Sequence, residues 1–436
     1  DATVNENGAS YVAYLFAHND GSFGEDSDEA VIKCGSYTGD DSNSNFVSLG
    51  FEPQFLLIKN ATTGSTNWML FDVMRGLPVI SGATARAIYG NTSAAETNNN
   101  SVYPSATGFT PRAAGSYTNT SGDTFIYIAI RRPHKPPETG TDVFNPSTQV
   151  GTVPNFSANF PVDFAIRLLT LGGNTTYSQT VVSRLTGETW LTTSQTNSEG
   201  TPSGFSIDLQ HMDGWGDFGG GGTGLSFKRA PGFMDVVAYT GTGSARNINH
   251  NLTVEPELAI IKSRDATGSW IVGSTAFSSG GHLVLDETGG MNNVGSTTRL
   301  VYADWSSTVL GIGADSDVNN SGTNYVAFLF ASLAGISKVG TYSGTGSDGI
   351  NVDCGFTTGA RFVMIKRTDS TGNWFVWDSN RGIVSGNDPY ILLNSTSAQD
   401  TTTDYIDPLN AGFTVNGSST AQINTSGGTY LFLAIA

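Results

Sequence analysis

The sequence predicts an all-β fold made of four tandem antiparallel β-sandwich domains, of jelly-roll or lectin-like type. A polar turn followed by an alternating apolar and aromatic run occurs four times, at 5–17, 119–130, 319–331 and 424–436. Charged residues are only 14% of the 436 residues, while Gly, Ser, Thr and Asn are abundant, which favours strands and turns over helices. A period of about 100 residues fits a complete sandwich domain. We therefore expect beads on a string, each with its own core.

The repeats divide the chain into six segments. Residues 1–29 are expected to hold the closing strand of a preceding repeat and an acidic linker, as in a fragment of a longer protein or a product of proteolytic maturation. The segments that follow are repeat A (30–132), a proline-rich linker (133–140), the diverged repeat B (141–230), repeat C (231–333) and repeat D (334–436). In the first segment Val12, Tyr14 and Phe16 alternate on one face, and we expect them to be buried.

Two residue types align across repeats A, C and D. A lysine ends an apolar strand, and a tryptophan follows eight or nine residues later. Indole faces stack on sugars, but recurrence at one place in a strand pattern favours core packing. We assign this role to Trp68, Trp270, Trp374 and Trp377; the aligned lysines are Lys59, Lys262 and Lys366.

An Asp-x-x-Arg-Gly motif occurs at 72–76 and 378–382. It could pair an acid with a guanidinium at a catalytic site. Because it recurs in repeats A and D, we interpret it as a structural turn in which side chains cap backbone groups.

The glycine-rich insertion at 211–222 is the candidate binding loop, because insertions in repeated units map to loops that carry function. We expect Asp213, Trp215 and Asp217 to form a host-glycan or cation contact there. The alternative is a flexible loop, since the same glycines serve both purposes.

No cofactor or metal site is predicted. The acidic stretches 24–29, 38–42 and 314–317 offer oxygen ligands suited to Ca²⁺, but none has the EF-hand spacing, so solvated loops are favoured. Cys34 and Cys354 are interpreted as two buried free thiols. The basic cluster of Arg131, Arg132 and Lys135 is a candidate anion-binding patch, but we favour the interpretation that it belongs to a solvated linker.

Charge and motifs restrict the function classes. A net charge of −17 disfavours nucleic acid and anionic lipid as partners, and no stretch is apolar enough for membrane insertion. The nucleophile elbow, zinc-protease and P-loop motifs are missing, so we do not expect an enzyme. A polysaccharide depolymerase is still open, because two carboxylates about 5–10 Å apart can come from separate strands.

Long phrases at 227–243, 335–346, 354–389 and 430–436, with 11–21 and 124–144, resemble tandem repeats in the tail-fibre and related tail proteins of tailed bacteriophages, especially those of marine and cyanobacterial hosts. The resemblance spans nearly the whole chain and is weakest in repeat B. It implies a structural virion protein on the tail, assembled in the host cytoplasm, that presents loops to host-surface glycan or protein. It also implies other virion proteins as partners and a homo-oligomer, with a trimer favoured. The alternatives are a capsid decoration or head fibre protein, and a polysaccharide-degrading tail spike.

Overall fold

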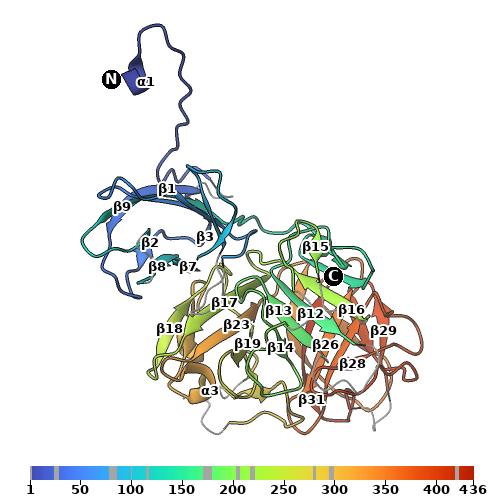
Figure 1. Ribbon diagram of the computed structural model, residues 1–436. Coiled ribbons are helices and arrows are strands. Elements are labelled where there is room, and N and C mark those ends of the chain that lie inside the picture. Colours follow the sequence, from blue (N-terminus) through green and yellow to red (C-terminus); the bar gives the residue numbers. More distant parts are fainter. Residues whose placement is uncertain are drawn as a thin grey trace.

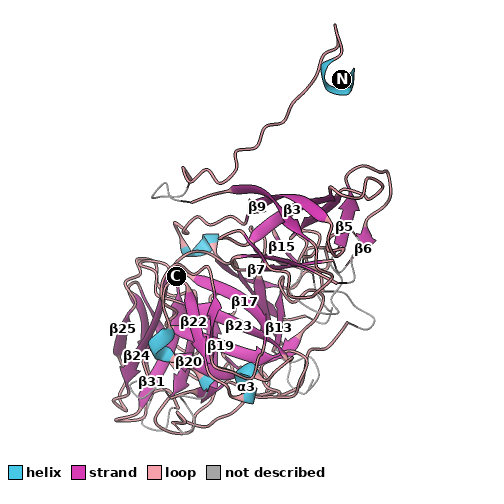
Figure 2. Ribbon diagram, turned by 90° about the vertical axis from the view of Figure 1, so that its left-hand side faces the viewer, coloured by secondary structure: helices cyan, strands magenta, loops and turns pink. Residues whose placement is uncertain are grey.

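The computed structural model describes residues 2–23, 29–77, 86–99, 101–113, 117–169, 179–202, 207–216, 221–277, 281–293, 299–417 and 422–436. Antiparallel strands dominate, and helical segments are single turns, among them α1 (Ala2–Asn5) and α3 (Ser316–Asn319) (Figures 1 and 2). The predicted all-β, sandwich-type fold is confirmed. In the described part of the chain, no helix has the length and apolar character to cross a membrane.

Each repeat has one large and one small antiparallel sheet. In repeat A the large sheet has the order β1-β9-β3-β4-β5-β6, and the small sheet β2-β8-β7. The strands are β1 (Ile32–Thr38), β2 (Val47–Ser48), β3 (Pro53–Asn60), β4 (Met69–Asp72), β5 (Arg86–Tyr89), β6 (Thr97–Asn98), β7 (Val102–Ser105), β8 (Gly108–Pro111) and β9 (Thr124–Arg131).

Repeat B follows a 3₁₀ turn, η1 (Gly140–Asp142), with the large sheet β10-β16-β12-β13-β14 and the pair β11-β15. Its strands are β10 (Phe144–Thr148), β11 (Phe156–Ser157), β12 (Phe164–Leu168), β13 (Thr180–Ser183), β14 (Leu191–Thr192), β15 (Gly214–Trp215) and β16 (Thr223–Phe227).

Repeats C and D have the large sheets β17-β23-β19-β20-β21 and β24-β31-β26-β27-β28, with the small sheets β18-β22 and β25-β30-β29. Repeat C contains β17 (Met234–Thr240), β18 (Arg246–Asn249), β19 (Leu258–Ser263), β20 (Ile271–Ser274), β21 (Leu283–Val284), η2 (Tyr302–Asp304), β22 (Val309–Ile312) and β23 (Asn324–Phe330). Repeat D contains β24 (Ser337–Ser343), β25 (Ile350–Asp353), β26 (Phe362–Arg367), β27 (Trp374–Asp378), β28 (Ile391–Leu392), β29 (Ile406–Leu409), β30 (Gly412–Val415) and β31 (Thr429–Ile435).

The recurring phrase supplies the closing strand of each complete repeat, β9, β23 and β31, which lies between the first and the third strand. A buried asparagine precedes this strand and bonds the turn that follows the first strand. Asn319, for example, accepts from the Thr242 N–H at 2.8 Å and donates to the Ser244 carbonyl at 2.6 Å. Asn119 and Asn424 make the same pair of bonds. The asparagine of the polar turn therefore ties the start of the closing strand to the end of the first strand.

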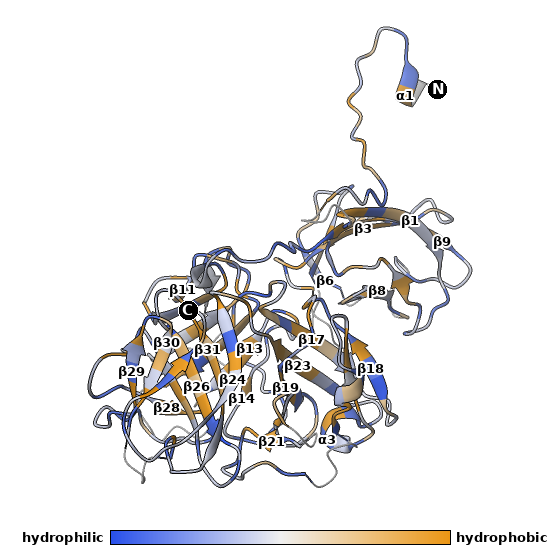
Figure 3. Ribbon diagram, turned by 180° about the vertical axis from the view of Figure 1, so that it is seen from behind, coloured by the Kyte–Doolittle hydropathy of each residue, from blue (hydrophilic) through white to orange (hydrophobic). Residues whose placement is uncertain are grey.

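The repeats are not independent beads. Each has an inner core between its two sheets, but repeats B, C and D also share a joint core formed by the outer faces of their large sheets. Phe164 of B lies 4.3 Å, ring centroid to centroid, from Phe328 of C, and Phe144 of B lies 5.5 Å from Phe362 of D. Figure 3 shows the hydrophobic stretches on these strands. The expectation of separate cores is therefore wrong for B, C and D, because both faces of their large sheets are apolar.

The start of repeat B and the end of repeat D lie side by side. A side chain at Gly140 would collide with the carbonyl oxygen of Ala436, and the Ala436 N–H donates to the Ile336 carbonyl at 2.9 Å. The chain thus enters and leaves the three-repeat body at one place.

The N-terminal segment does not form the predicted closing strand. It extends away from the body as an arm (Figures 1 and 2). Val12, Tyr14 and Phe16 are 81%, 82% and 49% exposed, so their predicted burial is wrong. The segment does not join repeat A either, because β9 already lies between the first and third strands there.

Candidate functional site

The predicted binding loop of repeat B is built differently from expectation. Trp215 is fully buried, stacks on Phe156 at 4.5 Å between ring centroids, and donates from Nε1 to Ser226 Oγ at 3.1 Å. Its predicted role as an exposed sugar contact is therefore wrong, because its strand β15 pairs with β11 and turns the indole inward. Asp213 is exposed, with its carbonyl accepting from the Ala158 N–H, and Asp217 lies outside the described residues.

The aligned tryptophans differ in burial. Trp270, Trp374 and Trp377 are at most 1% exposed, as predicted for core residues. Trp68 is 36% exposed, so the core prediction fails for it. The strand register places Trp68, Trp270 and Trp374 at one equivalent position, just before Met69, Ile271 and Phe375. The difference therefore comes from what covers the sheet and not from the local fold.

The Asp-x-x-Arg-Gly motif is a structural turn in both repeats. Asp378 accepts from the Arg381 backbone N–H at 3.0 Å and from Arg381 Nε at 2.6 Å. Asp72 and Arg75 make the same two bonds, at 2.9 and 2.7 Å. The closing glycines, Gly76 and Gly382, have φ of +102° and +120°, a region that favours glycine.

The acidic stretches make protein contacts where they are described. Asp40 accepts from Ser42 and Asn119, Asp315 caps α3, and Asp317 pairs with Arg299 at 2.7 Å. Residues 24–28 lie outside the description. In the described part of the chain, no group of three His, Cys, Asp or Glu side chains is arranged to hold a metal ion. Cys354 is buried, as expected, and burial raises its pKa to about 12, whereas Cys34 is only partly buried.

The interfaces between repeats carry a repeated clamp. Trp270 of repeat C donates from Nε1 to the Thr192 carbonyl of repeat B at 3.0 Å. Trp374 of repeat D donates to the Val284 carbonyl of repeat C at 2.9 Å. Thr192 and Val284 are equivalent by register, since they pair with Thr180 and Ile271. Each tryptophan thus holds the strand that ends the large sheet of the preceding repeat.

The aligned lysines are the second half of the clamp. Lys262 donates to the Thr196 carbonyl of repeat B at 3.3 Å, and Lys366 donates to the Thr288 carbonyl of repeat C at 2.9 Å. Each acceptor lies four residues after the carbonyl that its neighbouring tryptophan binds. Both lysine side chains are fully buried, and burial lowers the pKa of each to about 8.

The third junction, between repeats B and D, lacks the clamp. Register places Leu168 and Gln179 of repeat B where repeats C and D have the lysine and the tryptophan. Thr193 Oγ1 donates to the Leu393 carbonyl at 2.6 Å, and Gln179 Nε2 donates to the Ser395 carbonyl at 3.4 Å. We call this contact the B–D junction.

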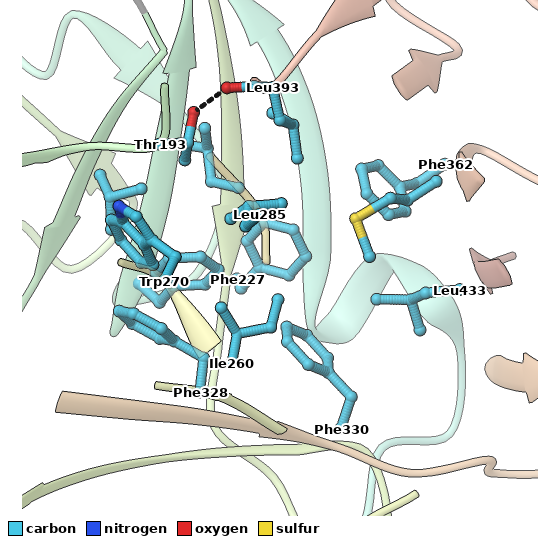
Figure 4. A pocket seen from close by; sticks show the side chains of 14 residues that line it. Thr193, Phe227, Ile260, Trp270, Leu285, Phe328, Phe330, Phe362, Leu393 and Leu433 are labelled. Carbon is cyan, nitrogen blue, oxygen red and sulfur yellow. Dashed lines mark hydrogen bonds between the residues drawn. The ribbon is translucent and has the colours of Figure 1, made fainter. Parts of the chain in front are cut away.

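Inside the ring of three repeats lies a small cavity of about 30 Å³ (Figure 4). Phe227, Ile260, Trp270, Phe330, Met364 and Leu433 are among its lining residues, which come from all three repeats. Among the described residues of the lining, Thr193 is the one with a hydroxyl group, which already donates to the Leu393 carbonyl. The cavity has the size of about one water molecule but few groups to bind one, so it is a packing defect of the joint core.

A buried ionic cluster joins repeat A to repeats B and C. Arg229 donates to Glu52 of repeat A at 2.8 and 2.9 Å. The remaining members are Arg132, Asp163, Arg184 and Asp235, with N–O distances between 3.5 and 3.7 Å. Although burial alone would lower it, the three carboxylates raise the pKa of Arg229. The charges of the three arginines and the three carboxylates cancel. Because the members come from repeats A, B and C, the cluster locks these repeats together. Arg132 is thus neither an exposed anion patch nor solvated, whereas Arg131 pairs with Glu29 and Lys135 with Glu138.

Repeat D contains one further unusual carboxylate. Asp388 is fully buried and accepts from the Val384 N–H at 2.8 Å and the Ile406 N–H at 3.3 Å. Burial, with the nearby charges of Asp404 and Asp407, raises its pKa to about 7. The backbone bonds position it as a loop anchor.

Comparison with known proteins adds a family. Comparisons with curated proteins and with solved structures found no match. A family profile described as a domain of unknown function (DUF7483) matches residues 1–133 and 221–436 and leaves out most of repeat B, the repeat whose sequence diverges most. Because the match covers well over half of the sequence, the chain belongs to the DUF7483 family.

Proposed function

We propose that this protein is a structural segment of a bacteriophage tail fibre or spike, which spaces and presents loops for attachment to glycan or protein on the host surface. The observation that carries the proposal is the way the repeats are joined. Clamps, a joint core and a buried ionic lock join the four sandwiches into one body. Such a body holds its repeats in fixed relative positions, as a structural protein requires. The resemblance of the repeat phrases to phage tail proteins supplies the setting.

The loops support an adhesive role. Residues 397–398 and 401–402, between β28 and β29 of repeat D, and 91–96 in repeat A are exposed, while the strands that bear them are anchored in cores. Several weak contacts on one assembly gain strength from effective concentration, so no single loop needs high affinity.

Cryo-electron microscopy of the intact particle tests the proposal. Density for this chain on the tail, together with binding of the purified chain to host cells, is the expected result. Density on the capsid shell would overturn the tail assignment in favour of a head appendage. Release of reducing sugar from host polysaccharide by the purified chain would instead assign a depolymerase.

A further inference from the structure

The described residues leave the outer face of the large sheet in repeat A uncovered. Phe55, Leu57, Leu70 and Ile128 are half-buried, and Trp68 and Ile126 are 36% and 41% exposed. The core of repeat A uses the alternate residues of the same strands, such as Leu56, Met69 and Tyr127. Figure 1 shows the small sheet, β2, β7 and β8, between this large sheet and the other repeats, so the outer face points away from them. An apolar face of this kind on a folded domain marks an interaction surface.

The same face is covered in the other repeats. By strand register, the six positions correspond to Leu258, Ile260, Trp270, Val272, Val326 and Phe328 of repeat C. All six lie in the joint core, as do their counterparts in repeat D. Repeats C and D therefore show what this surface packs against, which is the equivalent face of a homologous repeat.

Repeat A carries both halves of the clamp. The Trp68 backbone N–H donates to Asn91 Oδ1 at 2.9 Å, as that of Trp374 does to Asn394 and that of Trp270 to Asp286. Lys59 Nζ donates to the Thr66 carbonyl at 2.6 Å, the counterpart of the bond from Lys366 to Gly372. The acceptor side is Tyr89, which pairs with Met69 as Val284 pairs with Ile271, followed by the exposed residues 90–96.

We infer that three copies of this chain associate through the outer faces of their repeat A sheets, in the arrangement that repeats B, C and D adopt within one chain. Trp68 of each copy binds the Tyr89 carbonyl of the next, and Lys59 binds the carbonyl of Ser93. Because the donors and the acceptors lie at different sites on each copy, the contact between two copies is heterologous. Such contacts close into a ring of three when each copy is rotated by one third of a turn relative to the next. The rotation here is the one that already closes three repeats. The inference rests on repeat geometry and does not require the viral function proposed above.

The experiment is sedimentation velocity and light scattering on the full chain. We expect a mass three times the 45.8 kDa of one chain. Ile126→Glu places a charge on the uncovered face and should give the monomer mass. Val254→Glu is the matched control, because Val254 is 39% exposed on repeat C, away from this face, and this variant should keep the mass of the wild type. A monomeric wild type, or an Ile126→Glu variant with unchanged mass, would overturn the inference.

Two further measurements separate association from misfolding and from the arm. Trp68→Phe keeps an aromatic ring but removes the indole N–H, and should dissociate at several-fold higher concentration than the wild type while its far-ultraviolet circular dichroism is preserved. Removal of residues 2–23 should leave the trimer intact. If that deletion abolishes association and Ile126→Glu does not, the arm holds the copies together and the inference fails.

Discussion

Glu52 and Arg229 lie 177 positions apart in the sequence and are joined by two hydrogen bonds of 2.8 and 2.9 Å in the interior of the protein. Arg229 is 2% exposed and Glu52 is 4% exposed. The pair ties repeat A to the strand end at which repeat B passes into repeat C, so the attachment of repeat A depends on buried charge.

Glu52→Gln tests this lock. The substitution leaves three arginines facing two carboxylates, and removal of one partner from a buried pair costs about 3 kcal/mol or more. We expect a loss of that size in the free energy of unfolding in urea, with faster proteolysis in the linker after Arg132. Glu188→Gln is the control: Glu188 also bridges repeats A and B, through Arg86 at 2.9 Å, but is exposed, so its loss should cost less than about 1 kcal/mol. Equal losses would show that the cluster is not the lock.

Trp374→Phe tests the clamp. The variant loses the bond to the Val284 carbonyl and part of the indole volume, whereas Trp377→Phe, three residues away, loses volume alone. Trp377 Nε1 is buried with no hydrogen-bond partner in the described part of the chain. We expect Trp374→Phe to lower the free energy of unfolding by about 1–2 kcal/mol more than Trp377→Phe does. The opposite ranking would contradict a role for the inter-repeat bond.

The lowered pKa of Lys366 predicts that the free energy of unfolding depends on pH in the alkaline range. Its pKa is about 8 in the folded protein and 10.5 in the reference state, so between these values the unfolded chain binds more protons and stability rises with pH. The gain is at most about 3 kcal/mol. Lys366→Met and Lys366→Arg should both lose the share of this gain that comes from Lys366, the first because nothing titrates and the second because arginine stays charged, while Lys262, whose pKa is also about 8, keeps its own share. Urea titrations at pH 7.5 and 10 measure it, and an unchanged gain in both variants would refute the assignment.

Asp388 predicts the reverse trend on the acid side. Its pKa is raised from 3.8 to about 7, so the folded protein holds an extra proton between these values and stability falls as pH rises through them. The fall is at most about 4 kcal/mol. Asp388→Asn remains neutral, so its free energy of unfolding should decline less between pH 4 and pH 7. A parallel decline in the two proteins would mean that another group is responsible.

The sequence predicted the repeats well, because strand alternation and turn residues are local signals. The alignment of Lys59, Lys262 and Lys366, and of the tryptophans, also corresponds to true register. What these residues bind could not be predicted, since each acceptor carbonyl belongs to another repeat about 66–90 residues away. Trp215 was misjudged because a run of glycines suggests an exposed loop, whereas pairing with Phe156 decides its burial.

The adjacency of Gly140 and Ala436 has a mechanical consequence. A pull exerted between these two residues acts across the B–D junction and bypasses the two clamped interfaces. The junction that meets the force has no buried lysine or indole. It is held by Thr193 and Gln179, with further bonds from Arg361 to the Phe144 carbonyl and from Asn380 to Thr148. Tension between these two residues would therefore open the body at the B–D junction. The B–C and C–D contacts would stay intact while the distance between the two residues increases.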